Sequence, residues 1–141
     1  MSRDTKRLRR LLDLRRRQEE AARVQLAKSL RRAADISDEV RDRTEALEAV
    51  LGGNLEPRRH PHLAAIAAIA EPAILAAHAA EVSARGAAEE IRREWRRTAK
   101  RLKGLERLDE RRHAEEFELI QRGERAETDD AINSRHGEDE S

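Results

Sequence analysis

A heptad repeat of apolar residues in the first third of the chain is the feature that most restricts its fold. Reading backwards from Leu51, steps of four and three pass through Leu47, Thr44, Val40, Ser37, Ala33, Leu30 and Leu26. This alternation draws one stripe along an α-helix and is typical of a coiled coil. Upstream, three successive steps of four between Gln18 and Leu30 predict a stutter, and the repeat resumes through Leu8, Leu11, Arg15 and Gln18.

The composition favours long helices over a compact globule. Charged residues make up 42% of the 141 residues, and the aromatic residues are only Trp95 and Phe117. A compact core of this size normally uses several aromatic side chains, whereas an Ala, Leu, Glu and Arg mixture suits coiled coils. Disorder is the competing interpretation for so polar a chain. It is disfavoured because the apolar residues are periodic and the charges are finely mixed in sign.

A loop at residues 52–61 is predicted to separate two helices. Gly52-Gly53-Asn54 suits a left-handed helix cap, and Pro57 and Pro61 prevent immediate continuation. The first helix is therefore expected over residues 6–51 and the second over residues 62–134, followed by a frayed tail at 135–141.

A break or kink is expected in the second helix near residues 71–72. Pro72 either kinks the helix or occupies the first position of a new one, and we favour a restart at Pro72. Beyond it, a second stripe runs from Ala73 and Ala77 through Ala84 and Ala88 towards Leu105.

Two amphipathic helices joined by a short loop pack antiparallel, since neither can bury its stripe alone. We therefore predict an all-α fold, two long helices in an antiparallel coiled-coil hairpin, as a single domain over residues 1–141. The expected seam includes Leu26, Leu30, Val40, Leu47, Leu51, Ile91, Trp95, Leu102 and Leu105. Trp95 is expected to fill space near Ala22, with a partner-binding hot spot as the alternative.

The same register brings two basic stretches together. With Leu51 facing residues 63–72, Leu105 lies opposite residues 9–18. Residues 1–20 hold eight Arg or Lys against four acids, and residues 92–112 hold ten against four. This basic end is a candidate surface for a protein partner, which its charge would steer into place. The predicted binding residues are Arg7, Arg10, Arg96, Arg97, Lys100, Arg101, Lys103 and Arg107.

Two alternatives remain for these cations. They form a solvated helix face with i, i+4 ion pairs, or they bind nucleic acid. The interspersed acids and the lack of an aromatic platform or recognition motif argue against nucleic acid. Beyond the basic end, residues 113–141 hold three Arg against ten acids. Phe117 and Ile120 lie there beyond the expected start of the first helix, so they are candidate exposed docking residues.

Two blocks of the sequence resemble the flagellar FliJ family, small coiled-coil proteins of the type III flagellar export apparatus. One is LRRLLDLRRRQEEAARVQLAKSL (Leu8–Leu30), with a Leu-Leu pair followed by Arg/Gln/Glu-rich heptads. The other is EWRRTAKRLKGLERLDERRHAEEFELIQRGERAETDDAI (Glu94–Ile132), with a basic run, a Leu-x-x-Leu-x-x-Leu step and an acidic pair. The Ala-rich, Pro-broken stretch 63–81 and Gly123 depart from the family pattern.

This resemblance implies a stalk that binds and modulates the export ATPase hexamer and helps deliver export substrates or chaperones. It also implies contact with the membrane protein of the export gate, and a cytoplasmic location at the inner face of the inner membrane through partners. The alternative function is a generic self-associating coiled-coil scaffold.

Catalysis, cofactor binding and metal binding are not expected. The chain has no cysteine and no phosphate-binding glycine loop, and His60-Pro-His62 lacks a third nearby ligand. A two-helix rod has no enclosed pocket for a small-molecule substrate. The apolar window 63–80 is mainly Ala and contains Glu71, so we interpret it as a coiled-coil surface and not as a membrane span.

Overall fold

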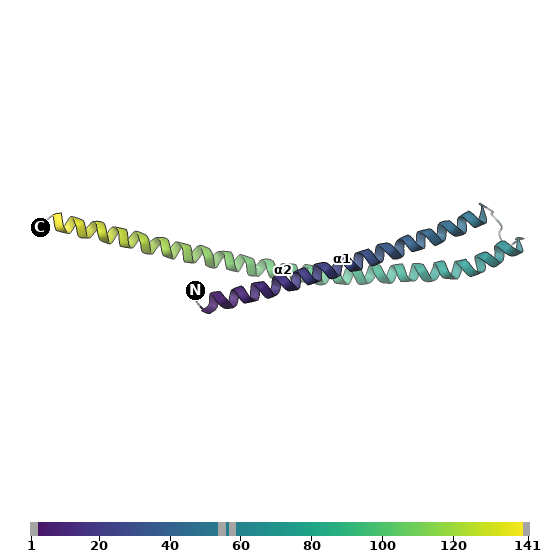
Figure 1. The fold of residues 1–141 in the computed structure, drawn as a ribbon, viewed down its shortest axis with the longest axis horizontal. Coiled ribbons are helices and arrows are strands. Elements are labelled where there is room, and N and C mark those ends of the chain that lie inside the picture. The colour runs from purple at the N-terminus through teal and green to yellow at the C-terminus, as the bar shows by residue number, and fades with distance from the viewer. Residues whose placement is uncertain (1–2, 54–55, 57–58, 140–141) are drawn as a thin grey trace. The chain divides into compact units, whose positions relative to one another are not determined.

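The computed structural model describes residues 3–53, 56 and 59–139, and this part of the chain contains two α-helices and no strand. Helix α1 spans Arg3–Leu51 (49 residues) and helix α2 spans Pro61–Asp139 (79 residues) (Figure 1). Both are rich in Ala, Leu, Glu and Arg, which have high helix propensity. The predicted fold class, an all-α hairpin of antiparallel helices, is confirmed.

The turn after α1 is formed by two glycines. Gly52 and Gly53 have φ values of 58° and 73°, which side chains other than glycine rarely adopt. The Gly52 amide donates a hydrogen bond to the Glu48 carbonyl oxygen at 3.0 Å, which satisfies one of the last carbonyls of α1. Asn54 and Pro57, which the sequence analysis assigned to the loop, lie outside the described residues.

Helix α2 differs from the sequence prediction at three points. It begins at Pro61, where the missing amide hydrogen costs nothing because first-turn amides have no intrahelical acceptor. It continues through Pro72, so the expected restart there is wrong. It also continues to Asp139, through most of the expected tail. Residues on both sides of Pro72, such as Ala70 and Ile74, line a groove with α1, and this packing holds the helix together despite one lost hydrogen bond.

The helices divide into two compact units, which are described separately. Unit 1 comprises residues 1–16 and 100–141, and unit 2 comprises residues 17–99. In unit 1, the Thr5 hydroxyl donates a hydrogen bond to a Glu116 carboxylate oxygen at 3.4 Å, and the Arg16 guanidinium lies 3.7 Å from the Glu106 carboxylate. These contacts agree with the predicted register. Leu8 and Leu12 are the buried apolar side chains of this unit.

Unit 2 contains the glycine turn, the greater part of α1 and about half of α2. Trp95 of α2 contacts Glu19 of α1, and Arg85 contacts Ser37, so the two helices are antiparallel here as well. The buried apolar residues are Ala33, Val40, Ala67 and Ala88. Three of the four are alanines, so this pair of helices packs closely while burying little apolar area.

The seam of α1 differs from the predicted one between Leu8 and Ala33. Leu12 is 3% exposed and Leu11 is 38% exposed, so Leu12 is the residue that faces α2. Glu19 is buried where Gln18 was expected. Ser29 is half-buried where Leu30 was expected, and Leu30 itself is 41% exposed. The steps through Leu8, Leu12, Arg15, Glu19, Ala22, Leu26, Ser29 and Ala33 alternate regularly, so no stutter lies between Gln18 and Leu30, where it was predicted. Two successive steps of four occur instead between Ser29 and Thr44, where Ile36 and Ser37 are both half-buried.

The other predicted seam residues occupy positions between the helices. Val40 is buried, and the half-buried ones are Leu26, Leu47, Leu51, Ile91, Trp95, Leu102 and Leu105. In α2, Glu81 is buried between Ala77 and Ala84, where the apolar pattern leaves a gap.

Candidate partner-binding surfaces

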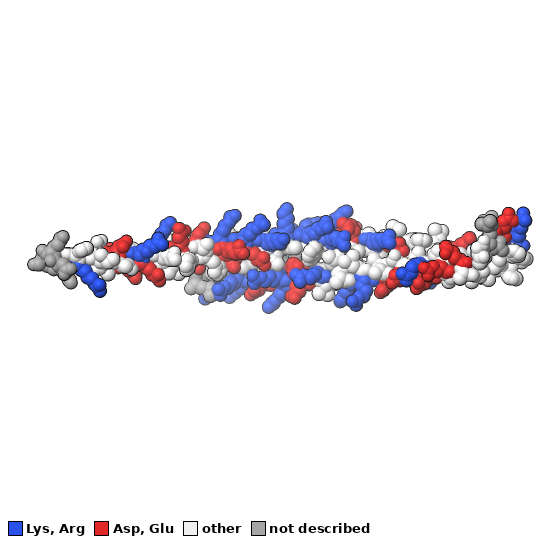
Figure 2. All heavy atoms as spheres, turned by 90° about the horizontal axis from the view of Figure 1, so that it is seen from above, with Lys and Arg blue, Asp and Glu red and all other residues white. Residues whose placement is uncertain are grey.

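Unit 1 brings together six of the eight basic residues that the sequence analysis selected. Arg7 and Arg10 come from α1, and Lys100, Arg101, Lys103 and Arg107 come from α2; all six are exposed. Within the described residues, none of the six lies within 4.0 Å of a carboxylate. Figure 2 shows Lys and Arg side chains standing out from both helices of this unit. Their positive charge is therefore available to a partner.

Arg96 and Arg97 belong to unit 2. Both are exposed, and the Arg97 guanidinium lies 3.7 Å from the Glu94 carboxylate, three residues earlier on the same helix. Exposed pairs of this kind contribute little stability, so the ion pair does not prevent Arg97 from contacting another molecule.

The C-terminal part of α2 extends beyond α1 in unit 1 (Figure 1). Thr5 lies opposite Glu116, so the described part of α1 begins opposite the region of α2 around Phe117. Every residue from His113 to Gly137 is exposed, and Phe117 and Ile120 are 62% and 60% exposed. We call residues 117–139 the overhang. Among the described residues of this segment, the large apolar side chains Phe117, Leu119, Ile120 and Ile132 are each at least half exposed.

A second apolar stripe of exposed residues, which we call the outer stripe, runs along α2. In unit 2 it alternates steps of three and four through exposed residues: Ala65, Ala68, Pro72, Leu75, Ala79, Val82 and Gly86. Leu75 is 72% exposed, Val82 is 70% exposed, and the neighbouring Ile69 is 78% exposed. This outer stripe carries no charge. An exposed apolar stripe with this coiled-coil spacing is suited to bind a further helix.

By length and composition alone, α2 also contains a stretch that meets the criterion for a membrane span, with a mean hydropathy of 1.7 over 18 residues. The most apolar window of its sequence, residues 63–80, includes residues of both stripes. One side of this window packs on α1, where Ala67 is buried.

The best-formed polar cluster of the protein lies between the helices of unit 2, where Glu19, Arg23 and Trp95 meet. Arg23 donates hydrogen bonds of 2.8 Å to both carboxylate oxygens of Glu19, four residues earlier. The Trp95 indole donates a hydrogen bond of 3.1 Å from Nε1 to Glu19 Oε1. The buried carboxylate is thus satisfied from both helices. Trp95 was expected near Ala22, about one helical turn away.

The pKa of Glu19 is lowered from its ordinary value of 4.5. Hydrogen bonds from Arg23 are the largest cause, burial opposes them, and the Trp95 hydrogen bond adds to the lowering. A carboxylate whose pKa is lower in the folded state stabilises that state above its unfolded pKa. This stability is lost as the pH falls through the lowered folded value.

Glu19→Gln is therefore expected to lower the free energy of unfolding by about 1 kcal/mol at pH 7. The difference from wild type should shrink below about pH 4.5 and vanish in stronger acid, because Glu19 itself becomes neutral. Denaturation followed by the fluorescence of Trp95, the only tryptophan, measures it. Glu39→Gln is the matched control. Glu39 pairs with Arg43 at 2.8 Å but is 53% exposed, so its change should stay below about 0.5 kcal/mol. Equal losses in the two variants would contradict the assignment.

A similar cluster occurs in α2, where Glu81 is buried and lies 3.0 Å from the Arg85 guanidinium. Arg85 also donates a hydrogen bond of 3.4 Å to the Ser37 hydroxyl of α1. The sequence analysis identified neither buried glutamate. A sequence pattern that could have revealed both glutamates is Glu-x-x-Ala-Arg, which occurs at residues 19–23 and 81–85. In both places the glutamate occupies a core position of the heptad repeat.

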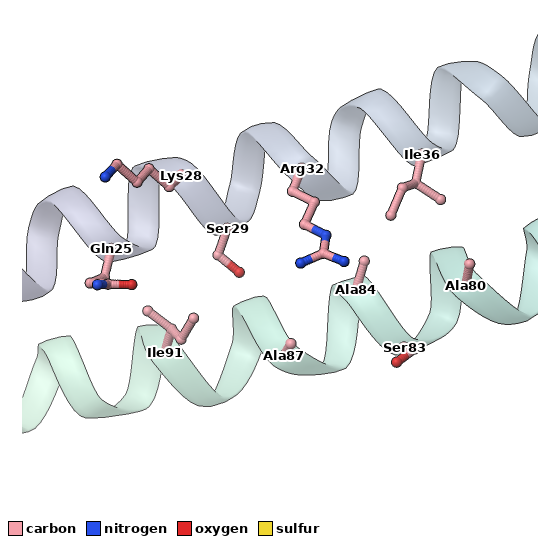
Figure 3. A pocket seen from close by; sticks show the side chains of 10 residues that line it. All are labelled: Gln25, Lys28, Ser29, Arg32, Ile36, Ala80, Ser83, Ala84, Ala87 and Ile91. Carbon is pink, nitrogen blue, oxygen red and sulfur yellow. The ribbon is translucent and has the colours of Figure 1, made fainter.

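Unit 2 also contains an open groove of about 440 Å³ between the helices (Figure 3). Ala80, Ala84 and Ala87 line it on one side, opposite Ser29 and Arg32. On the α2 side the lining side chains are small, apart from Ile91, which leaves open space between the helices. Among the described residues, no group of three His, Asp or Glu side chains is placed to hold a metal ion. The expectation that the protein has no catalytic, cofactor or metal site stays a prediction.

The family described as "Flagellar FliJ protein" matches residues 5–140, which is nearly the whole chain. No curated protein and no solved structure matches the chain.

Proposed function

Because the chain belongs to the FliJ family and is thus a coiled-coil protein of flagellar export, we propose that its basic end binds the export ATPase hexamer and modulates ATP hydrolysis. The protein adds no chemistry of its own in this proposal. Family membership implies a cytoplasmic protein associated with the export apparatus. Attachment to the cytoplasmic face of the inner membrane would follow from binding to partners there.

The observation that supports this proposal is the positive charge of residues 3–16 and 100–112, which pair in unit 1. Residues 3–16 hold seven Arg or Lys against two Asp, and residues 100–112 hold six against three acids. The contacts of Thr5 and Arg16 with α2 bring these stretches side by side, although nearly 100 positions separate them in the sequence. Clustered cations accelerate association with an acidic partner and orient it. Arg96 and Arg97 continue the basic run along α2.

The outer stripe of α2 is the surface we assign to the other proposed partners, the membrane protein of the export gate and the export chaperones or substrates. Leu75, Val82 and Ile69 are among the most exposed large apolar residues of the chain. Burying one such side chain fully contributes about 1.5–3 kcal/mol, so three together support a specific contact with a helix. This surface and the basic end share no residues, so the two kinds of partner do not compete for the same side chains.

The proposal is tested by reversing three charges: Lys100→Glu, Lys103→Glu and Arg107→Glu in one variant. The concentration that gives half-maximal stimulation of the purified export ATPase is expected to rise about tenfold to hundredfold, since exposed charges contribute up to about 1 kcal/mol each. Lys28→Glu, Arg31→Glu and Arg32→Glu make the same change of charge in unit 2 and serve as the matched control. That control should stimulate as wild type does.

Unchanged stimulation by the first variant, with helicity intact, would eliminate the basic end as the ATPase contact. Binding of about one copy per hexamer is expected on the proposed function, whereas a generic scaffold would show no affinity for the ATPase. Tight binding to an unrelated duplex with a steep salt dependence would instead favour nucleic acid as the partner.

A further inference from the structure

Two properties of the overhang suggest that it binds another surface. Its large apolar side chains are exposed, and it holds more acidic than basic residues. Phe117, Leu119, Ile120 and Ile132 are each at least half exposed. The overhang is little more than 20 residues long and contains Gly123, which has low helix propensity. In proteins most of the stability of a helix comes from tertiary packing of its apolar face, and the apolar side chains of the overhang are exposed. The overhang therefore gains stability from any surface that covers it.

The charge of the overhang is opposite to that of the rest of unit 1. The overhang, residues 117–139, holds seven acids against three Arg. The paired part of unit 1, residues 3–16 and 100–112, holds thirteen Arg or Lys against five acids. The complementary surfaces thus lie next to each other along the chain.

One molecule cannot bring these two surfaces face to face. Helix α2 runs without interruption from Lys100 through the overhang to Asp139, so the overhang points away from the basic part along the same helix axis. Folding back would require breaking α2 and losing its hydrogen bonds there. The opposite charges are instead satisfied between two copies, if the copies meet end to end and overlap.

We propose that two copies associate through unit 1 in an antiparallel dimer, with the overhang of each lying along the basic paired part of the other. The arrangement is two-fold symmetric, so each contact is made twice. The paired part also presents exposed leucines that suit the apolar side chains of the overhang: Leu11, Leu14 and Leu108. Each overhang thus gains both apolar cover and opposite charge. This inference does not rest on the proposed function.

A charge exchange tests the proposal by sedimentation velocity on the full chain. The first variant carries Glu124→Lys, Glu127→Lys and Asp130→Lys in the overhang. The second carries Lys100→Glu, Lys103→Glu and Arg107→Glu in the paired part. Wild type is expected to form a dimer whose dissociation constant rises at least tenfold between about 50 mM and 500 mM salt, since salt screens exposed charges. Each variant alone should be monomeric, because like charges then face each other.

An equimolar mixture of the two variants is the decisive sample. In a mixed dimer the lysines of one overhang meet the glutamates of the second variant, and the native acids of the other overhang meet native cations. Both contacts are restored, so the mixture should form dimers with wild-type affinity. A mixture that remains monomeric while both variants keep their helicity would overturn the proposal, as would a wild type that is monomeric at every concentration.

Two further variants distinguish the antiparallel dimer through unit 1 from other kinds of self-association. Glu39→Lys, Glu45→Lys and Glu48→Lys make the same charge change in unit 2 and should leave the dimer intact; loss of the dimer here would place the interface outside unit 1. Phe117→Ala with Ile120→Ala should weaken the dimer at least tenfold. An unchanged dissociation constant in that variant would contradict the packing of the overhang on the second copy.

Discussion

Replacing Leu12 by Ala is expected to lower the free energy of unfolding of unit 1 by about 2–5 kcal/mol. Leu12 is 3% exposed, the lowest value among the buried apolar residues, and it packs in the α1 seam with Leu8. Truncation removes buried methyl groups and leaves a cavity that the neighbouring side chains fill only in part. Urea denaturation followed by circular dichroism measures the loss. Since unit 1 contains few buried apolar residues, its cooperative transition should move to markedly lower urea.

Leu14→Ala is the matched control for this prediction. Leu14 lies half a turn away on the same helix and is 50% exposed, so its truncation should change the free energy of unfolding by no more than about 0.5 kcal/mol. Similar losses for Leu12 and Leu14 would mean that the seam of α1 does not face α2 as described.

On the proposed function, Leu12→Ala should also weaken stimulation of the export ATPase, because this packing holds the basic residues of the two helices together.

Replacing Pro72 by Ala is expected to raise the free energy of unfolding by about 2 kcal/mol. Pro72 lies inside α2 and is exposed, so the new side chain meets no obstacle. The substitution restores an amide that can donate to the Ala68 carbonyl, a gain of about 3 kcal/mol relative to proline. Greater freedom of the unfolded chain removes up to about 1 kcal/mol of that gain. Thermal unfolding followed at 222 nm measures the result.

Pro61→Ala provides the comparison, since Pro61 is the first residue of α2 and its missing amide hydrogen has no intrahelical role. Its effect should be below about 1 kcal/mol in either direction. Were Pro72→Ala equally neutral, α2 would have to begin anew at residue 72, as the sequence had suggested.

The fold of this protein follows from patterns that the sequence displays openly. Alternating steps of three and four predict the helices, and Gly52-Gly53 predicts the turn, because only glycine adopts these φ values without strain. The register, and with it the meeting of the basic stretches in unit 1, follows from the position of that turn. These inferences succeed because each depends on local stereochemistry or on the shortness of the loop.

The details of the seam could not be predicted from hydrophobicity. Glu19 was passed over in favour of Gln18, since a charged residue is normally costly to bury, and Ser29 was passed over in favour of Leu30, since Leu30 is apolar. Glu19 is tolerated only because Trp95 and Arg23 supply its hydrogen bonds, and Trp95 lies 76 positions away. Pro72 misled for a related reason: the local rule predicts a helix end, whereas packing of the flanking residues on α1 decides the outcome.

The two buried glutamates have a mechanical consequence. A seam of alanines and leucines alone offers little resistance to axial sliding, since displacement by a heptad exchanges one small apolar contact for another. Sliding α2 by a single turn, about 5.4 Å, would take the Trp95 indole away from Glu19 and leave a carboxylate in the seam with one fewer donor. Arg85 and Ser37 would separate in the same movement. The polar clusters therefore resist axial sliding of α1 and α2, so that a force applied to one helix of unit 2 is transmitted to the other.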